Sequence, residues 1–103
     1  MTGVQTCALP ICGVGGAVAS AIGERLARLA EATQLLVVTH SPQVAARGAA
    51  HLLIAKSSDG TVTRTGVRPL DSAQRQEEIA RMLSGAEVTA EARAQAMRLI
   101  EAA

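Results

Sequence analysis

Two short stretches of this sequence have the residue types and spacing to contact a phosphate group. The first is Gly13-Val14-Gly15-Gly16, which directly precedes a helical pattern. Bare backbone N–H groups at the start of a helix, together with the helix dipole, can face an anion. A dinucleotide-binding fingerprint needs a strand immediately before its glycines, whereas Cys7 to Cys12, with Pro10 among them, precede these. The spacing alone therefore fits a plain tight turn better than a dinucleotide site.

The second stretch is a histidine placed directly after an apolar run. His40 follows Leu35–Thr39 and precedes Ser41-Pro42-Gln43. In open α/β sheets ligands gather at the carboxyl ends of strands, so a phosphate would be met at this position. A neutral imidazole can donate one hydrogen bond and accept another. The position fits equally well a histidine that only satisfies a loop carbonyl. His51 begins an exposed-looking strand, and we interpret it as structural.

The residues that ATP hydrolysis requires are missing from the sequence. No G-x-x-x-x-G-K-[ST] loop occurs, and the only lysine, Lys56, has no glycine-rich run before it. No pair of carboxylates follows a hydrophobic strand, so no magnesium ligand is visible and we expect no metal site. Cys7 and Cys12 have neither a second cysteine pair nor a nearby histidine, and we interpret them as incidental thiols.

The elements that would position these residues follow an α/β order: helix, buried strand, short helix, β-hairpin and two further helices. Apolar residues recur at helical spacing between Val18 and Leu29, which predicts a helix over about 16–32. Residues 35–38 are too few for a helix and do not alternate in polarity. This pattern is typical of a strand covered on both faces, usually a central parallel strand.

Capping and turn residues predict the remaining elements. Ser41, followed by a proline, predicts one helical turn. Residues 51–56 and 61–67 flank Asp59-Gly60, a pair that suits the positive φ angles of a tight turn, so we expect a β-hairpin.

Two helices are expected to close the chain. Asp71 and Gln74 form an approximate capping box for the first helix, and Gly85 ends it. Thr89 has the side chain of a helix cap and begins the second.

The composition indicates a thin core. The 103 residues include no Phe, Tyr or Trp, so the large apolar side chains that usually dominate cores are absent. The formal net charge of +1 argues against a dense nucleic-acid footprint, so any DNA contact is expected outside this segment. No apolar run reaches the length of a membrane span, so we expect no membrane partner.

Three motifs taken together resemble the closing segment of the RecN family, ATPases related to the SMC and ABC-type heads. They are GVGGAVASAIGERLARLA, QLLVVTHSPQVAARGAAHLLIAK and EEIARMLSG, and the resemblance covers about residues 13–103. VVTHSPQVAA alone would fit many ABC-type heads, whereas its pairing with EEIARMLSG points to this family. The resemblance implies a partial P-loop NTPase head, with residues 13–103 as its C-terminal part. It also implies ATP-driven head engagement in the repair of DNA double-strand breaks and in recombination.

The resemblance also implies roles for individual residues. Gly13, Gly15 and Gly16 would be the remainder of the D-loop, which faces the partner head across a shared nucleotide. His40 would be the switch that senses the γ-phosphate of ATP, and Gln43, in the same loop, would also lie at the nucleotide.

The chain departs from the family directly upstream of the glycine turn. There the family carries a hydrophobic strand ending in Asp-Glu-x-Asp, which supplies the magnesium ligand, the catalytic glutamate and the D-loop aspartate. The corresponding positions here hold Ala8, Leu9 and Ile11, which neither bind a metal nor polarise water. Residues 1–12 resemble translated sequencing-adapter sequence, and we interpret them as a non-native leader.

The same resemblance sets the expected cofactors and partners. ATP and magnesium would bind the full-length parent, whereas this chain alone, without Walker A or Walker B, would be inactive. The expected partners are the missing N-terminal part of the head, a second head in a homodimer, and DNA through the parent protein, in the cytoplasm at the nucleoid. Two alternatives remain: a small phosphate-binding module built on Gly13–Gly16, and a helical protein-interaction module formed by residues 71–103.

Overall fold

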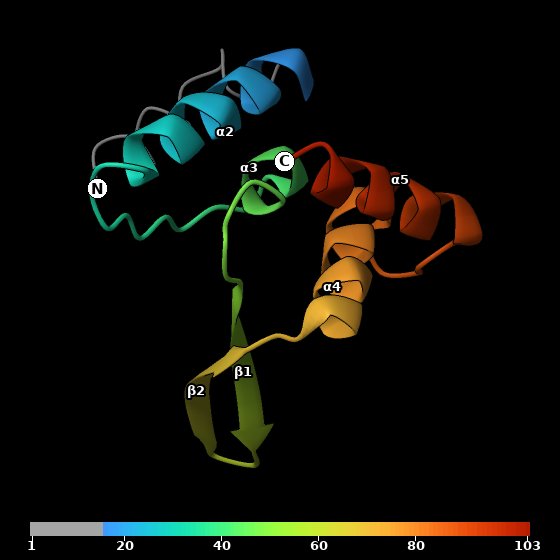
Figure 1. The fold of residues 1–103 in the computed structure, drawn as a ribbon. Helices are drawn as coiled ribbons and strands as arrows, with labels where there is room; N and C mark the ends of the chain where they lie inside the picture. The colour runs from blue at the N-terminus through green and yellow to red at the C-terminus, as the bar shows by residue number, and fades with distance from the viewer. Residues whose placement is uncertain (1–15) are drawn as a thin grey trace.

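The computed structural model describes residues 16–103, which form helices and one two-stranded sheet (Figure 1). The expectations for residues 1–15, including those for Gly13 and Gly15, lie outside the described residues. In chain order the elements are α2 (Gly16–Ala30), α3 (Pro42–Ala45), β1 (Leu52–Asp59), β2 (Val62–Pro69), α4 (Ser72–Ser84) and α5 (Ala90–Glu101).

The helix boundaries confirm the predictions made from capping residues. The Asp71 carboxylate accepts a hydrogen bond from the Gln74 backbone N–H at 2.8 Å, and the Gln74 side chain accepts one from the Asp71 N–H at 3.0 Å. These bonds satisfy donors that a helix start leaves free. Gly85 ends α4 with φ 83°, and Thr89 caps α5 through a 3.1 Å bond to its Oγ1. No helix among residues 16–103 is long and apolar enough to cross a membrane.

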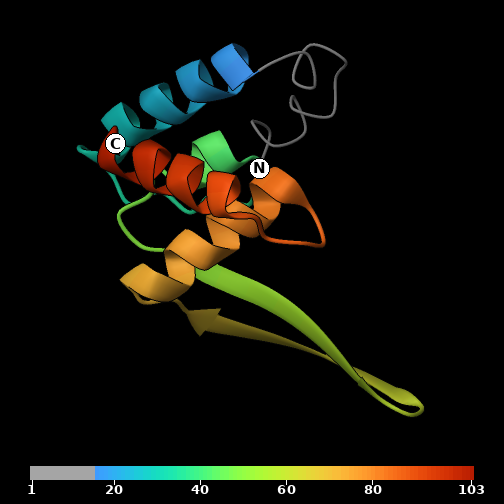
Figure 2. The same cartoon turned by 90° about the vertical axis from the view of Figure 1, so that its right-hand side faces the viewer.

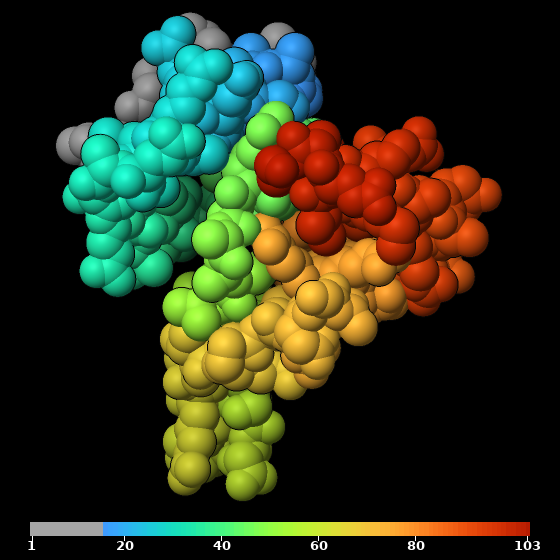
Figure 3. All heavy atoms as spheres, viewed as in Figure 1, coloured from blue at the N-terminus to red at the C-terminus, as the bar shows by residue number. Residues whose placement is uncertain are grey.

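The β-hairpin is also confirmed, with a turn one residue later than expected. Asp59 pairs with Val62, so the two-residue loop is Gly60-Thr61. Of these two loop residues only Gly60 has a positive φ, at 70°, which suits the first position of a two-residue hairpin loop. Every residue of β2 is exposed, and in the space-filling view the hairpin projects from the helices (Figure 3).

The prediction of a buried strand at residues 35–38 is wrong. Residues 34–39 form no strand, and the side chains of Leu36 and Val38 are 71% and 54% exposed. A strand needs a hydrogen-bonded neighbour, and the only strand pair among the described residues is β1 with β2. The apolar run therefore has no partner strand among the described residues, and its side chains alternate between half-buried (Leu35, Val37) and exposed (Leu36, Val38).

The core lies between α4 and α5 and is as thin as the composition predicts. Ile79 is the only large side chain that is fully buried among the described residues. The other residues in this buried cluster are alanines: Ala46, Ala80, Ala92 and Ala96. Because alanine buries little area, the close approach of the helices supplies much of the packing.

The short helix α3 lies between α2 and α4 and contacts both (Figure 2). Gly23, in the middle of α2, is buried where the two helices approach. A Cβ atom at this position would lie 3.0 Å from the Gln43 carbonyl oxygen and 3.3 Å from the Val44 Cα. The absence of a side chain at residue 23 therefore allows α2 to reach the backbone of α3.

We expect Gly23→Val to loosen α2 from α3 and to lower the free energy of unfolding by about 1–3 kcal/mol, because the new methyl groups would overlap backbone atoms. Ala21→Val is the matched control, since it adds the same β-branched side chain at an exposed position of the same helix. Chemical denaturation followed by circular dichroism measures both. Equal stability of the two variants would contradict the packing described here.

Candidate functional site

The structure brings the start of α2 and the start of α3 together through the side chain of Gln43. A Cβ atom on Gly16 would lie 3.1 Å from Gln43 Nε2. At the other end of the amide, Gln43 Oε1 accepts a hydrogen bond from the Ser41 hydroxyl at 3.1 Å. Two residues predicted to share a site, 27 positions apart in the sequence (43 − 16), are therefore neighbours.

The loop that carries His40 is ordered by its own hydrogen bonds. The Ser41 backbone N–H donates to Thr39 Oγ1 at 3.0 Å, and Ser41 precedes α3 as its N-cap residue. The Ser41 hydroxyl makes no capping bond, because it donates to Gln43 instead. His40 itself is exposed, so its imidazole is accessible to a ligand.

The chemistry of these side chains fits weak contacts to a phosphate. The groups at the start of α3 are an imidazole, hydroxyls and an amide, which can donate single hydrogen bonds to phosphate oxygens. Residues 16–103 contain no group of three or more His, Cys, Asp or Glu side chains that could hold an ion.

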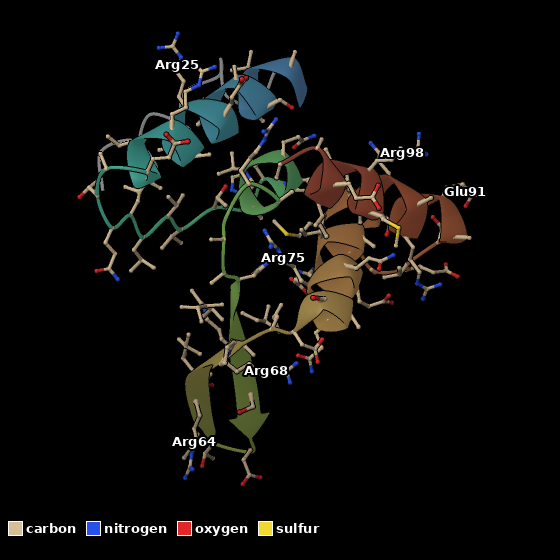
Figure 4. All side chains as sticks on the ribbon, viewed as in Figure 1. Arg25, Arg64, Arg68, Arg75, Glu91 and Arg98 are labelled. Atoms are coloured by element: carbon tan, nitrogen blue, oxygen red, sulfur yellow. The ribbon has the colours of Figure 1, made fainter. Side chains whose placement is uncertain are left out.

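Sequence reasoning missed Arg75, the residue that ties α3 to α4. Its Nη2 atom donates to the backbone carbonyls of Ala45 at 3.1 Å and Ala46 at 3.0 Å, and also to that of Gly48. Figure 4 shows Arg75 between α4 and the chain that leads from α3 to β1. No motif signals such a contact, because its acceptors are main-chain atoms 27–30 residues away.

His51 lies beside Arg75, and the structure corrects the expectation that it is exposed. The ring is half-buried, and its Nδ1 atom is buried without a hydrogen-bond partner. Burial lowers the pKa of His51, and the nearby Arg75 charge lowers it further, while Glu78 opposes the shift. Its position next to the segment after α3 agrees with a structural role.

A shallow hollow of about 210 Å³ lies elsewhere, between the hairpin and α4. Its charged lining residues are Arg68, Glu77, Glu78 and Arg81. Arg81 is already paired with Glu78, and Glu77 with Arg93. The hollow includes neither His40 nor Gln43, so it is separate from the candidate site.

Comparison with known proteins finds several relatives that share one name. No family model matches the chain. The DNA repair protein RecN of Streptomyces coelicolor is 53% identical over 91 residues, which is 88% of this chain and 16% of that protein. RecN of Xylella fastidiosa strain 9a5c is 46% identical over 86% of the chain, and RecN of Rickettsia bellii is 47% identical over 75% of it. The chain corresponds to a segment of RecN.

The RecN match confirms the resemblance found in the sequence motifs. The chain spans 14–16% of the length of these relatives. A mixed helix and strand content is compatible with an α/β fold, and RecN similarity suggests an SMC- or ABC-type protein.

We expect the stability of this chain to fall as the pH drops below the ordinary His51 pKa of 6.5. Because the folded-state pKa of His51 is lowered, the unfolded chain takes up a proton that the folded chain resists, so stability is full above this value and is lost below it. Thermal unfolding between about pH 7.5 and pH 5 measures the slope, and His51→Gln is expected to reduce it. An unchanged slope in that variant would contradict the assignment.

Proposed function

We propose that this chain is the C-terminal part of a RecN-type P-loop ATPase head, and that it faces the terminal phosphate of ATP. In this proposal His40 is the γ-phosphate switch, and Gly13, Gly15 and Gly16 are the remainder of the D-loop. The observation that supports it is the contact of Gln43 with Gly16, because the loop after His40 then borders the end of the glycine turn.

The proposed work of these residues is positioning and sensing. The exposed His40 imidazole would contact the γ-phosphate and respond to its loss on hydrolysis. Gln43, which bonds Ser41 and lies against Gly16, would transmit a movement of this loop to the start of α2. Magnesium and ATP would be held by the phosphate loop and carboxylates of the complete head, none of which lies among residues 16–103.

The whole protein would act in the repair of DNA double-strand breaks and in recombination. The relatives named above are DNA repair proteins, which supports this part of the proposal. Two heads of a homodimer would engage across ATP in the cytoplasm, at the nucleoid, with the D-loop remainder facing the second head. DNA would be contacted by parts of the protein outside this nearly neutral segment.

We expect the chain alone to show no ATP turnover and no ATP binding tighter than about millimolar, because a few neutral hydrogen bonds supply only roughly 1–3 kcal/mol. Isothermal titration calorimetry and a phosphate-release assay measure both properties. Sustained turnover by the purified chain would overturn this expectation.

The switch assignment is tested in Streptomyces coelicolor RecN that carries residues 16–103 of this chain in place of its own matching segment. We expect His40→Ala to lower the kcat of ATP hydrolysis by roughly 10²-fold with a much smaller change in nucleotide affinity, because the contact matters most as charge develops on the phosphate. Arg64→Ala is the control, since it removes an exposed polar side chain of the hairpin strand β2. An equal loss of binding and turnover in the His40 variant would contradict the assignment.

A further inference from the structure

Arg75 reaches the C-terminal end of α3, the short helix of the candidate site, from a different element. It lies in the first turns of α4, where its own N–H donates to the Asp71 carbonyl at 2.8 Å. The capping box at the same helix end fixes the direction of this turn. The guanidinium therefore starts from an ordered backbone before it crosses to α3.

The hydrogen-bond acceptors of Arg75 are backbone carbonyls of the last residue of α3 and of residues just after it. One amino group, with two protons, faces the oxygens of Ala45, Ala46 and Gly48. The last carbonyls of a helix lack partners within it, so they are open to a donor from another element. The Ala45 carbonyl also accepts a hydrogen bond from the Gly48 N–H at 3.3 Å, so Arg75 adds a charged donor to a turn that is already partly bonded. Its own Nε atom is buried without a hydrogen-bond partner.

The short helix α3, which receives these bonds, is not stable by itself. α3 has only four residues, and a single helical turn is not stable in isolation. Its conformation must come from neighbours, which here are α2, through the close approach at Gly23, and α4, through Arg75. Of these contacts, only the Arg75 bonds are charged and directional.

We propose that Arg75 is a positioning residue, which holds α3 so that Gln43 lies against Gly16 and His40 is presented from a fixed loop. Ser41 and Gln43 belong to the same short segment as the carbonyls that Arg75 binds, so movement at its end is carried to its start. The consequence for catalysis rests on the proposed function of His40, whereas the ordering of α3 does not.

The first test measures local order in the chain itself. Arg75→Met keeps the length of the side chain and removes its charge and its donors, whereas Arg75→Lys keeps the charge. Amide hydrogen exchange of Ala45 and Ala46, whose N–H groups bond to Ser41 and Pro42, reports whether α3 is formed. We expect exchange there to rise roughly tenfold or more in Arg75→Met, less in Arg75→Lys, and little in α5.

Arg81→Met is the matched control, because it removes an arginine of the same helix whose partner, Glu78, also lies in that helix. It should leave exchange in α3 unchanged. Unchanged exchange in Arg75→Met, or an equal rise throughout the chain, would overturn the positioning role, because Arg75 would then be either dispensable or important only for global stability.

The second test measures catalysis in the RecN protein that carries this segment. We expect Arg75→Met to lower kcat by about tenfold with KM changed less than about twofold, and Arg75→Lys to restore part of the loss. If His40→Ala lowers kcat and Arg75→Met does not, the positioning inference is overturned. If exchange in α3 rises but neither variant changes kcat, the proposed switch fails and the catalytic part of the inference fails with it, while the ordering of α3 by Arg75 stands.

Discussion

The arrangement of the described residues depends on how one helical turn is held from two sides. On one side Gly23 lets α2 approach the α3 backbone, and on the other Arg75 of α4 donates to the carbonyls at the end of α3. α3 is thus the point where the N-terminal helix meets the C-terminal helix pair (Figure 2). The buried core is made mostly of alanine, so these few directional contacts carry more of the specificity than they would in a larger core.

This arrangement also links the candidate site to residues that would never touch a ligand. Gln43 joins the loop after His40 to the start of α2. α2 is held against α3 at Gly23, and the other end of α3 is bound by Arg75. A nucleotide contact at the exposed histidine would therefore act on a segment whose other end is anchored. Because α3 is anchored, a small displacement of the loop that carries His40 would move α2 instead of being lost in a local deformation of α3.

Local signals predicted most of the elements, because the chemistry of their boundaries lies within a few residues. The Asp71 and Gln74 pair, the Thr89 cap and the hairpin turn are of this kind. The strand expected at residues 35–38 failed because a strand is defined by its neighbour, and residues 16–103 provide none. The contact of Arg75 was missed for a related reason. Its acceptors are main-chain carbonyls 27–30 residues away, and every residue has such a carbonyl, so the residue types do not identify the acceptors. The neighbouring positions of Gly16 and Gln43 were expected from the family resemblance and not from spacing.

The use of main-chain oxygens as the acceptors of Arg75 has a consequence for sequence variation. A carbonyl is present whatever side chain a residue carries, so a substitution at Ala45 leaves its acceptor in place. Ala46 is buried, and a Cβ atom on Gly48 would lie 3.1 Å from the Ala50 carbonyl oxygen, so these two acceptor residues are restricted in size. On the α4 side of this turn the sequence requirement therefore lies mainly at position 75, because the atoms that accept its bonds belong to the main chain.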